Sequence, residues 1–112
     1  MPASKLTWDT HMYGLIGKMT AQPGHRDALQ GILLSNDAGM PGCLSYIIAQ
    51  DASDPDALWI TEVWDTQASH SASLGLPVVQ AAIAKAKPMI AGFSNRVVTT
   101  PLGGIGLRSS AS

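Results

Sequence analysis

A few side chains in this mostly apolar chain have types that could bind a small molecule and move a proton. His70 carries an imidazole, which titrates near neutral pH and could accept a proton. The amide of Asn36 could bond to a substrate oxygen or to a developing anion. Trp64 could stack on a flat ring, Tyr46 could donate a hydrogen bond, and Met19 could line a pocket.

Each of these residues also has a purely structural interpretation. His70 could cap a helix or lie on its surface, and Asn36 could bond to backbone near a helix end. Trp64 and Met19 could simply pack in the core, and Tyr46 could lie on a sheet face that a second copy covers.

Glu62 lies two residues before Trp64, so the two share one face of a predicted strand. We interpret this carboxylate as a structural group, held by an ion pair with Arg96 or by a hydrogen bond at an interface.

Several other classes of site are excluded by spacing and charge. His11, His25 and His70 have no metal-ligand spacing, and no phosphate-binding glycine loop is present. The net charge is −1 and neither sign is clustered, which argues against nucleic acid or a membrane surface as partner. No apolar run is long enough to span a bilayer, and residues 1–10 lack the apolar centre of a secretory signal. We therefore expect a cytoplasmic protein.

The candidate residues need a scaffold, and the hydrophobic pattern predicts one with the order β-α-β-β-α-β. The expected elements are strands over 12–20, 43–50, 57–64 and 93–100, and helices over 24–38, 66–74 and 77–86. This order is typical of a ferredoxin-like α+β domain, with a four-stranded antiparallel sheet and helices on one face. We expect a domain over 11–102, an N-terminal extension over 1–10 and a flexible tail over 103–112.

Both faces of the predicted sheet are apolar. In the second strand, Leu44, Tyr46 and Ile48 alternate with Cys43, Ile47 and Ala49. Helices can cover one face, so the other needs a partner. The chain is 46% hydrophobic and only 13% charged, against roughly 25% charged in an ordinary soluble domain. These features predict a homodimer in which two sheets pack together.

The chain also resembles a known family in a series of short motifs, found in order over residues 12–104. These are Pro23-Gly24, Met40-Pro41-Gly42-Cys43-Leu44-Ser45-Tyr46, Glu62-Val63-Trp64-Asp65, His70 and Gly92-Phe93-Ser94. Together they resemble the antibiotic biosynthesis monooxygenase superfamily, and its quinol monooxygenase-like members most. The resemblance implies a dimeric α+β barrel with a small pocket in each subunit.

Some members of that superfamily oxygenate quinol-like or phenolic substrates with molecular oxygen and no metal or organic cofactor. The resemblance therefore implies an oxidoreductase of this kind, with a small aromatic substrate and O2 as its partners. A second histidine commonly follows three residues after the position of His70, but this chain has Ser73 there. The haem-degrading branch has Asn, Trp and His at positions that fall here on Gly17, Ser73 and Ile83, so haem degradation is disfavoured.

A second hypothesis remains open beside the enzyme. A non-catalytic dimer of the same fold, acting in small-molecule binding or stress response, would keep the pocket without the chemistry.

Overall fold

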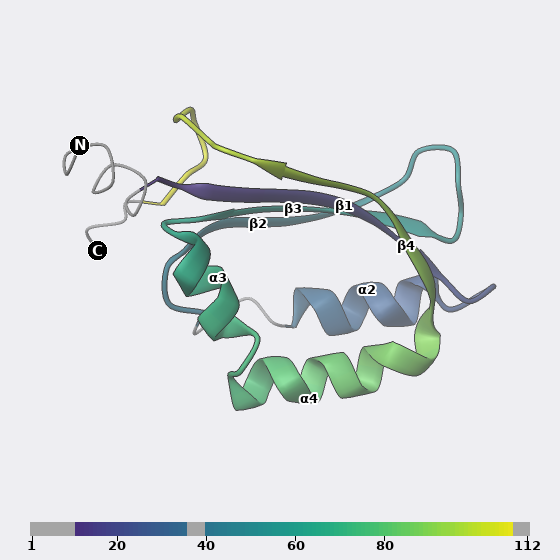
Figure 1. The fold of residues 1–112 in the computed structure, drawn as a ribbon. Coiled ribbons are helices and arrows are strands. Elements are labelled where there is room, and N and C mark those ends of the chain that lie inside the picture. The colour runs from purple at the N-terminus through teal and green to yellow at the C-terminus, as the bar shows by residue number, and fades with distance from the viewer. Residues whose placement is uncertain (1–10, 36–39, 109–112) are drawn as a thin grey trace.

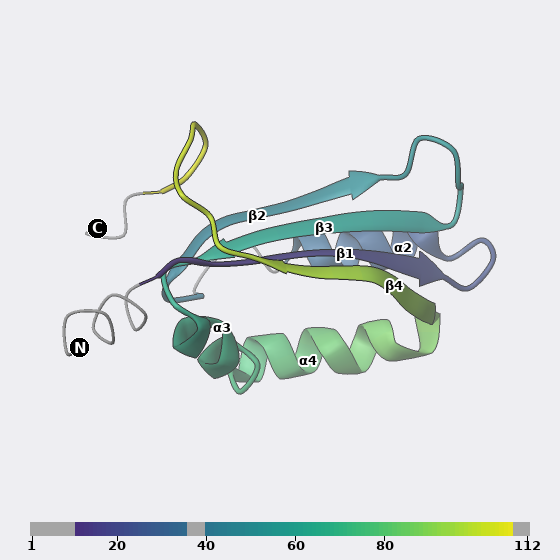
Figure 2. The same cartoon turned by 45° about the horizontal axis from the view of Figure 1, so that its top comes forward.

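The computed structural model describes residues 11–35 and 40–108, which form a four-stranded antiparallel sheet with helices on one face (Figure 1). The elements are β1 (Tyr13–Ala21), α2 (Arg26–Leu34), β2 (Cys43–Gln50), β3 (Ala57–Trp64), α3 (Gln67–Ser73), α4 (Pro77–Ala86), the 3-10 turn η1 (Lys87–Met89) and β4 (Ile90–Thr99). The strand order is β2-β3-β1-β4, and Figure 2 shows α3 and α4 below the strands and α2 behind them. The predicted ferredoxin-like α+β fold is confirmed.

The helix boundaries follow from local chemistry. The Thr66 hydroxyl accepts a hydrogen bond from the Ser69 backbone N–H at 3.1 Å, so Thr66 caps α3. Pro77 occupies the first turn of α4, where its missing N–H costs nothing. The helix predicted over 24–38 is observed as α2, and residues 36–39 lie outside the described part of the chain.

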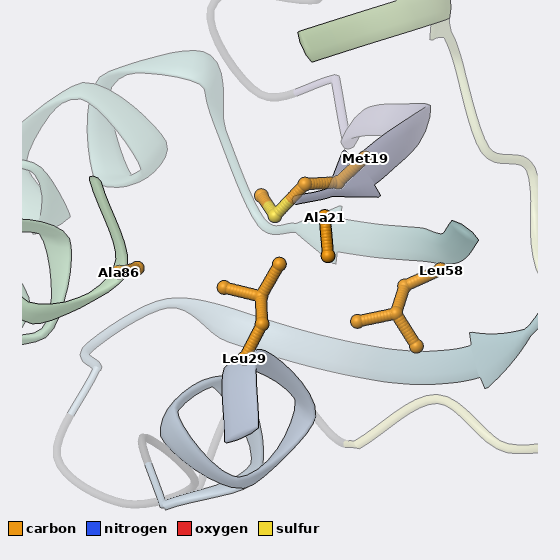
Figure 3. Packing of buried hydrophobic residues seen from close by; sticks show 5 residues of the cluster. All are labelled: Met19, Ala21, Leu29, Leu58 and Ala86. Atoms are coloured by element: carbon orange, nitrogen blue, oxygen red, sulfur yellow. The ribbon is translucent and has the colours of Figure 1, made fainter. Parts of the chain in front are cut away.

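The tightest packing lies between the sheet, α2 and α4 (Figure 3). Leu29 of α2 and Leu58 of β3 are fully buried there. They pack with Met19 and Ala21 of β1 and with Ala86 of α4. This cluster fixes the two long helices against one end of the sheet.

Cross-strand register divides the sheet into rows with opposite exposure. Tyr46, Glu62 and Leu15 are neighbours in one row, which faces the helices. In the next row Ile47 pairs with Thr61 and Val97 with Ile16, on the face that no helix covers. There Ile47 is 56% exposed and Val97 is 49% exposed, so this chain alone leaves apolar side chains in water.

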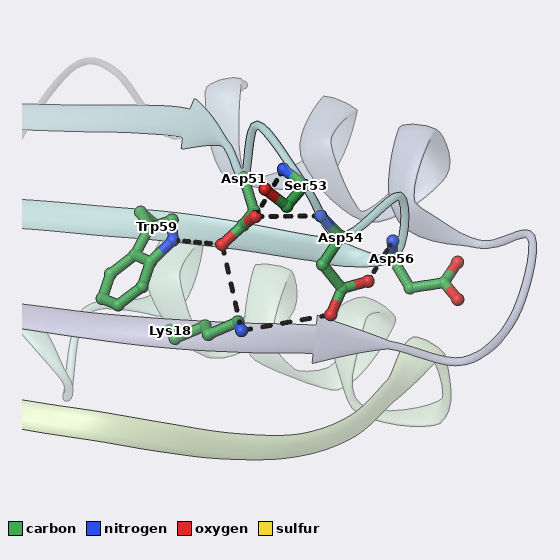
Figure 4. A network of polar contacts seen from close by, with 6 residues as sticks. All are labelled: Lys18, Asp51, Ser53, Asp54, Asp56 and Trp59. Carbon is green, nitrogen blue, oxygen red and sulfur yellow. Dashed lines mark hydrogen bonds and ion pairs between the residues drawn. The ribbon is translucent and has the colours of Figure 1, made fainter.

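A polar network fixes the turn between β2 and β3 (Figure 4). One oxygen of Asp51 accepts the backbone N–H groups of Ser53 and Asp54 at 2.8 and 2.9 Å. Its other oxygen accepts the Trp59 indole N–H at 2.7 Å and lies 3.9 Å from the Lys18 ammonium. These donors, with the indole first, lower the pKa of Asp51 to about 2.

Beyond β4 the chain continues on the side of the sheet opposite the helices (Figures 1 and 2). The Arg108 backbone N–H donates to the Leu44 carbonyl of β2 at 3.0 Å. The predicted extension over 1–10 and the last four residues of the predicted tail lie outside the described residues. In the part of the chain that is described, none of the helices has the length and apolar character needed to cross a membrane.

We predict that Asp51→Asn lowers stability at neutral pH and flattens its acid dependence. A carboxyl whose pKa is lowered by folding stabilises the native state above its unfolded pKa of about 3.9, and loses that contribution as the pH falls through about 2. Urea unfolding at pH 7, 4 and 2 should show the parent losing stability across that window and the variant losing less. Asp27→Asn, at an exposed carboxylate, is the control. Equal acid slopes in the parent and Asp51→Asn would contradict the assignment.

Candidate functional site

A cavity of about 770 Å³ lies between the helix-facing side of the sheet and the three helices. Its polar or polar-tipped lining residues are Tyr46, Glu62, Trp64, His70, Ser73 and Lys87. The remaining lining residues are apolar side chains and one glycine, contributed by all four strands or their ends and by α2, α3 and α4. A largely apolar chamber with a few polar groups is the usual form of a small-molecule site.

His70 is placed by the short helix α3 and by the turn that precedes β2. Gly42 has a φ of +85°, and a Cβ atom there would lie 2.5 Å from the Ser69 hydroxyl. Only glycine allows this close approach, which lets α3 lie against the start of β2. The His70 ring then lies 5.4 Å from the Tyr13 ring centroid and 5.5 Å from that of Trp64.

Trp64 is 1% exposed and ends β3 beneath His70, to which its ring is edge-on. The indole N–H donates to Glu62 Oε1 at 3.0 Å. This bond satisfies the buried indole donor and holds one carboxylate oxygen in place. The Trp64 ring therefore contributes both a wall of the cavity and a fixed position for the carboxylate.

The pKa values of two groups on β2, the Tyr46 hydroxyl and the Cys43 thiol, are raised. Burial, followed by the negative charge of Glu62, raises the pKa of Tyr46 to about 12, so its hydroxyl keeps its proton at neutral pH. Burial also raises the pKa of the partly buried Cys43 thiol, which disfavours the reactive thiolate.

The structure brings four of the five predicted site residues to this cavity. His70, Trp64, Tyr46 and Met19 all line it, although Met19 also belongs to the buried core cluster. Asn36 lies outside the described residues, so its proposed role stays a prediction.

The suggested ion pair between Glu62 and Arg96 is not found, and the alternative of a hydrogen bond at an interface stays a prediction. Among the described residues the ion pairs are those of Lys18 and Arg26, and Arg96 forms none with Glu62. The carboxylate bonds instead to Trp64, two residues along the same strand. The shared parity of Glu62 with Ile60 and Trp64 was the signal that could have placed it in the cavity.

Within the part of the chain that the structure describes, no three His, Cys, Asp or Glu side chains group in a way that could hold a metal ion. The site combines an imidazole, a phenol, a carboxylate, an indole, a serine hydroxyl and a lysine ammonium with a largely apolar lining. This set can exchange hydrogen bonds with a hydroxylated ring and can accept a proton from it.

Comparison with known proteins gives the chain a family context. The model of the antibiotic biosynthesis monooxygenase family matches residues 12–85. A Chloroflexus aurantiacus structure, provisionally named an antibiotic biosynthesis monooxygenase, is 60% identical with a TM-score of 0.83, and the match covers 86% of this chain and 98% of that one. A Nitrosomonas europaea structure with the same provisional name is 20% identical with a TM-score of 0.75, covering 83% and 92%. A Pseudomonas aeruginosa structure is 22% identical with a TM-score of 0.73, covering 85% and 98%. No curated protein matches the chain.

We predict that Trp64→Phe lowers the free energy of unfolding by about 1–3 kcal/mol, because the Glu62 carboxylate loses its indole donor in an apolar setting. Adding Glu62→Met should recover most of that loss, since removing both partners of a buried bond costs much less than removing one. Urea unfolding followed by far-UV circular dichroism measures both variants. A double variant no more stable than Trp64→Phe alone would contradict the coupling.

Proposed function

The chain belongs to the antibiotic biosynthesis monooxygenase family, and from that premise we propose that it is a cofactor-independent monooxygenase acting on a small quinol or polyphenol. The observation that carries the proposal is the cavity of about 770 Å³, in which His70 lies beside Trp64 within a largely apolar lining.

The reaction makes physical demands that this cavity can meet. Without a cofactor the substrate itself must supply electrons to oxygen, so it must be an electron-rich ring that ionises to a delocalised anion. Oxygen is apolar and favours an apolar chamber, and the anion must be kept from water. The cavity offers mostly apolar walls, and its volume lies within the range of small-molecule pockets, so it has room for a small aromatic ligand.

In the proposed reaction each of four lining side chains has a separate role. The His70 imidazole takes the hydroxyl proton of the substrate, and the Trp64 indole packs against the ring. Tyr46, whose raised pKa keeps its hydroxyl protonated, donates to a substrate oxygen. Met19 adapts the apolar floor to the ring.

One observation favours the alternative of a non-catalytic binding protein. The His70 imidazole contacts two aromatic rings, and within residues 11–35 and 40–108 no side chain accepts a hydrogen bond from it. Catalytic histidines are commonly oriented by such an acceptor. At the position where many members have a second histidine, Ser73 is buried and its hydroxyl donates to the His70 carbonyl.

We predict that the protein accelerates oxygen uptake by 1,4-dihydroxynaphthalene above its spontaneous oxidation in air. His70→Ala should lower the protein-dependent rate at least about tenfold, because it removes the proton acceptor. His25→Ala, an exposed histidine that does not line the cavity, should leave the rate unchanged. The quinol is prepared anaerobically and uptake is followed with an oxygen electrode. A rate equal to that of buffer would favour the binding protein.

We further propose that two copies pair through the uncovered face of the sheet. That face presents Ile16, Ile47 and Val97 in one row, with Trp59 in the row that contains Lys18. Burying such a row removes apolar surface from water, worth about 25 cal/mol per Å². A second copy offers the same row and so can be self-complementary about a two-fold axis.

We predict that light scattering at micromolar concentration gives about twice the chain mass, and that Val97→Asp shifts the protein toward monomer. A charge on the covered face would lose its hydration in the dimer. Val78→Asp is the matched control, because Val78 on α4 is 51% exposed and Val97 is 49% exposed. A monodisperse monomer for the parent, or equal effects of the two variants, would contradict this interface.

A further inference from the structure

The Glu62 carboxylate is the least expected group in the cavity. It lies on the helix-facing side of β3 between Ile60 and Trp64, with Leu15 and Tyr46 as its cross-strand neighbours. Most of the surrounding lining is apolar. Placing a carboxylate in such surroundings is costly unless it is paired or hydrogen-bonded.

The carboxylate is only partly satisfied by the protein. Oε1 accepts the Trp64 indole N–H, and no ion pair involves Glu62 among the described residues. Oε2 receives no hydrogen bond from any side chain or backbone group in that part of the chain, yet it is not sealed from accessible space. Glu62 therefore lines the cavity with one oxygen that has no hydrogen-bond donor from the described residues.

An ionised carboxylate can only accept hydrogen bonds, so its open oxygen discriminates among ligands by their donors. A ligand hydroxyl gives it a charge-assisted bond. A carbonyl, ether or carboxylate oxygen at the same place would face the lone pairs of the Glu62 oxygen and could form no hydrogen bond with it. The field of this charge is already felt at the adjacent Tyr46, whose ionisation it opposes.

We propose that Glu62 is a specificity residue that selects neutral aromatic ligands carrying a free hydroxyl group and disfavours the corresponding ethers, quinones and carboxylates. This inference rests on the proposed function, because it takes the cavity as the site of an aromatic ligand. Under this proposal the hydrogen bond to Glu62 retains the reduced, hydroxylated ring in the cavity, and its loss favours release of the oxidised ring. His70 keeps its separate role as the proton acceptor.

The test measures binding, not turnover, with two neutral probes of one ring system. Isothermal titration compares 1-naphthol, which has one hydroxyl donor, with 1-methoxynaphthalene, which has none. The parent should bind the naphthol about tenfold to a hundredfold more tightly, the range expected for one hydrogen bond to a charged group. Glu62→Gln keeps an acceptor for the Trp64 indole but removes the charge and adds a donor, so the preference should fall toward parity.

Asp27→Asn removes the same charge at an exposed position outside the cavity and should keep the parental preference. Equal affinities of the parent for the two probes would overturn the inference and leave the proposed function standing, without recourse to any variant. A preference that persists in a folded Glu62→Gln protein would assign the selection to another group and also overturn it. Binding of neither probe to the parent would overturn both the inference and the aromatic site on which it rests.

Discussion

The alternation of side chains along β3 is the constraint on which the rest of the molecule depends. This strand lies between β2 and β1, so its register fixes the rows on both neighbours. Ile60, Glu62 and Trp64 face the cavity, and the residues between them face the other way. A slip of one residue would turn the carboxylate and the indole out of the chamber and bring Thr61 and Val63 into it. The Asp51 network at the β2–β3 turn opposes such a slip, because it ties the turn to Trp59 and to Lys18 of β1.

The cavity exists because the helices pack closely at one end of the sheet and not along its length. Leu29 and Ala86 pack with Leu58 and Ala21 in the buried cluster. α4 lines the cavity with the small side chain of Ala82, where a larger residue would take up part of its volume. The short helix α3, seated on Gly42, closes the far end with His70. The buried cluster thus fixes the positions of α2 and α4 against the sheet, and these elements form the walls of the cavity.

Much of this scaffold could be predicted because turn-forming residues separate the apolar segments of the chain clearly. Pro23-Gly24, the aspartate-rich turn over 51–56 and Pro77 separate segments whose apolar spacing is unambiguous, so β2, β3 and α4 begin and end where the pattern places them. The site was less accessible to the same reasoning. Strand parity shows that a strand has two faces without saying which one meets the helices. It grouped Glu62 with Trp64 correctly, yet a carboxylate among apolar residues suggested an ion pair. Only the three-dimensional arrangement shows that Glu62 forms no ion pair among the described residues.

A carboxylate that is held by one donor and left open on its other side has a definite physical consequence for the chamber. The indole bond holds one oxygen of the carboxylate, and the other oxygen, which has no donor from the described residues, can accept a hydrogen bond from a ligand hydroxyl. A glutamine at this position would accept and donate alike, and a leucine would do neither, so neither would distinguish a hydroxyl from a carbonyl. The neutral phenol of Tyr46, whose pKa is raised, adds a complementary group, because beside the carboxylate acceptor it can donate a hydrogen bond to a second ligand oxygen. Acceptor and donor lie side by side on paired strands, so their spacing is set by the sheet itself and not by a mobile loop.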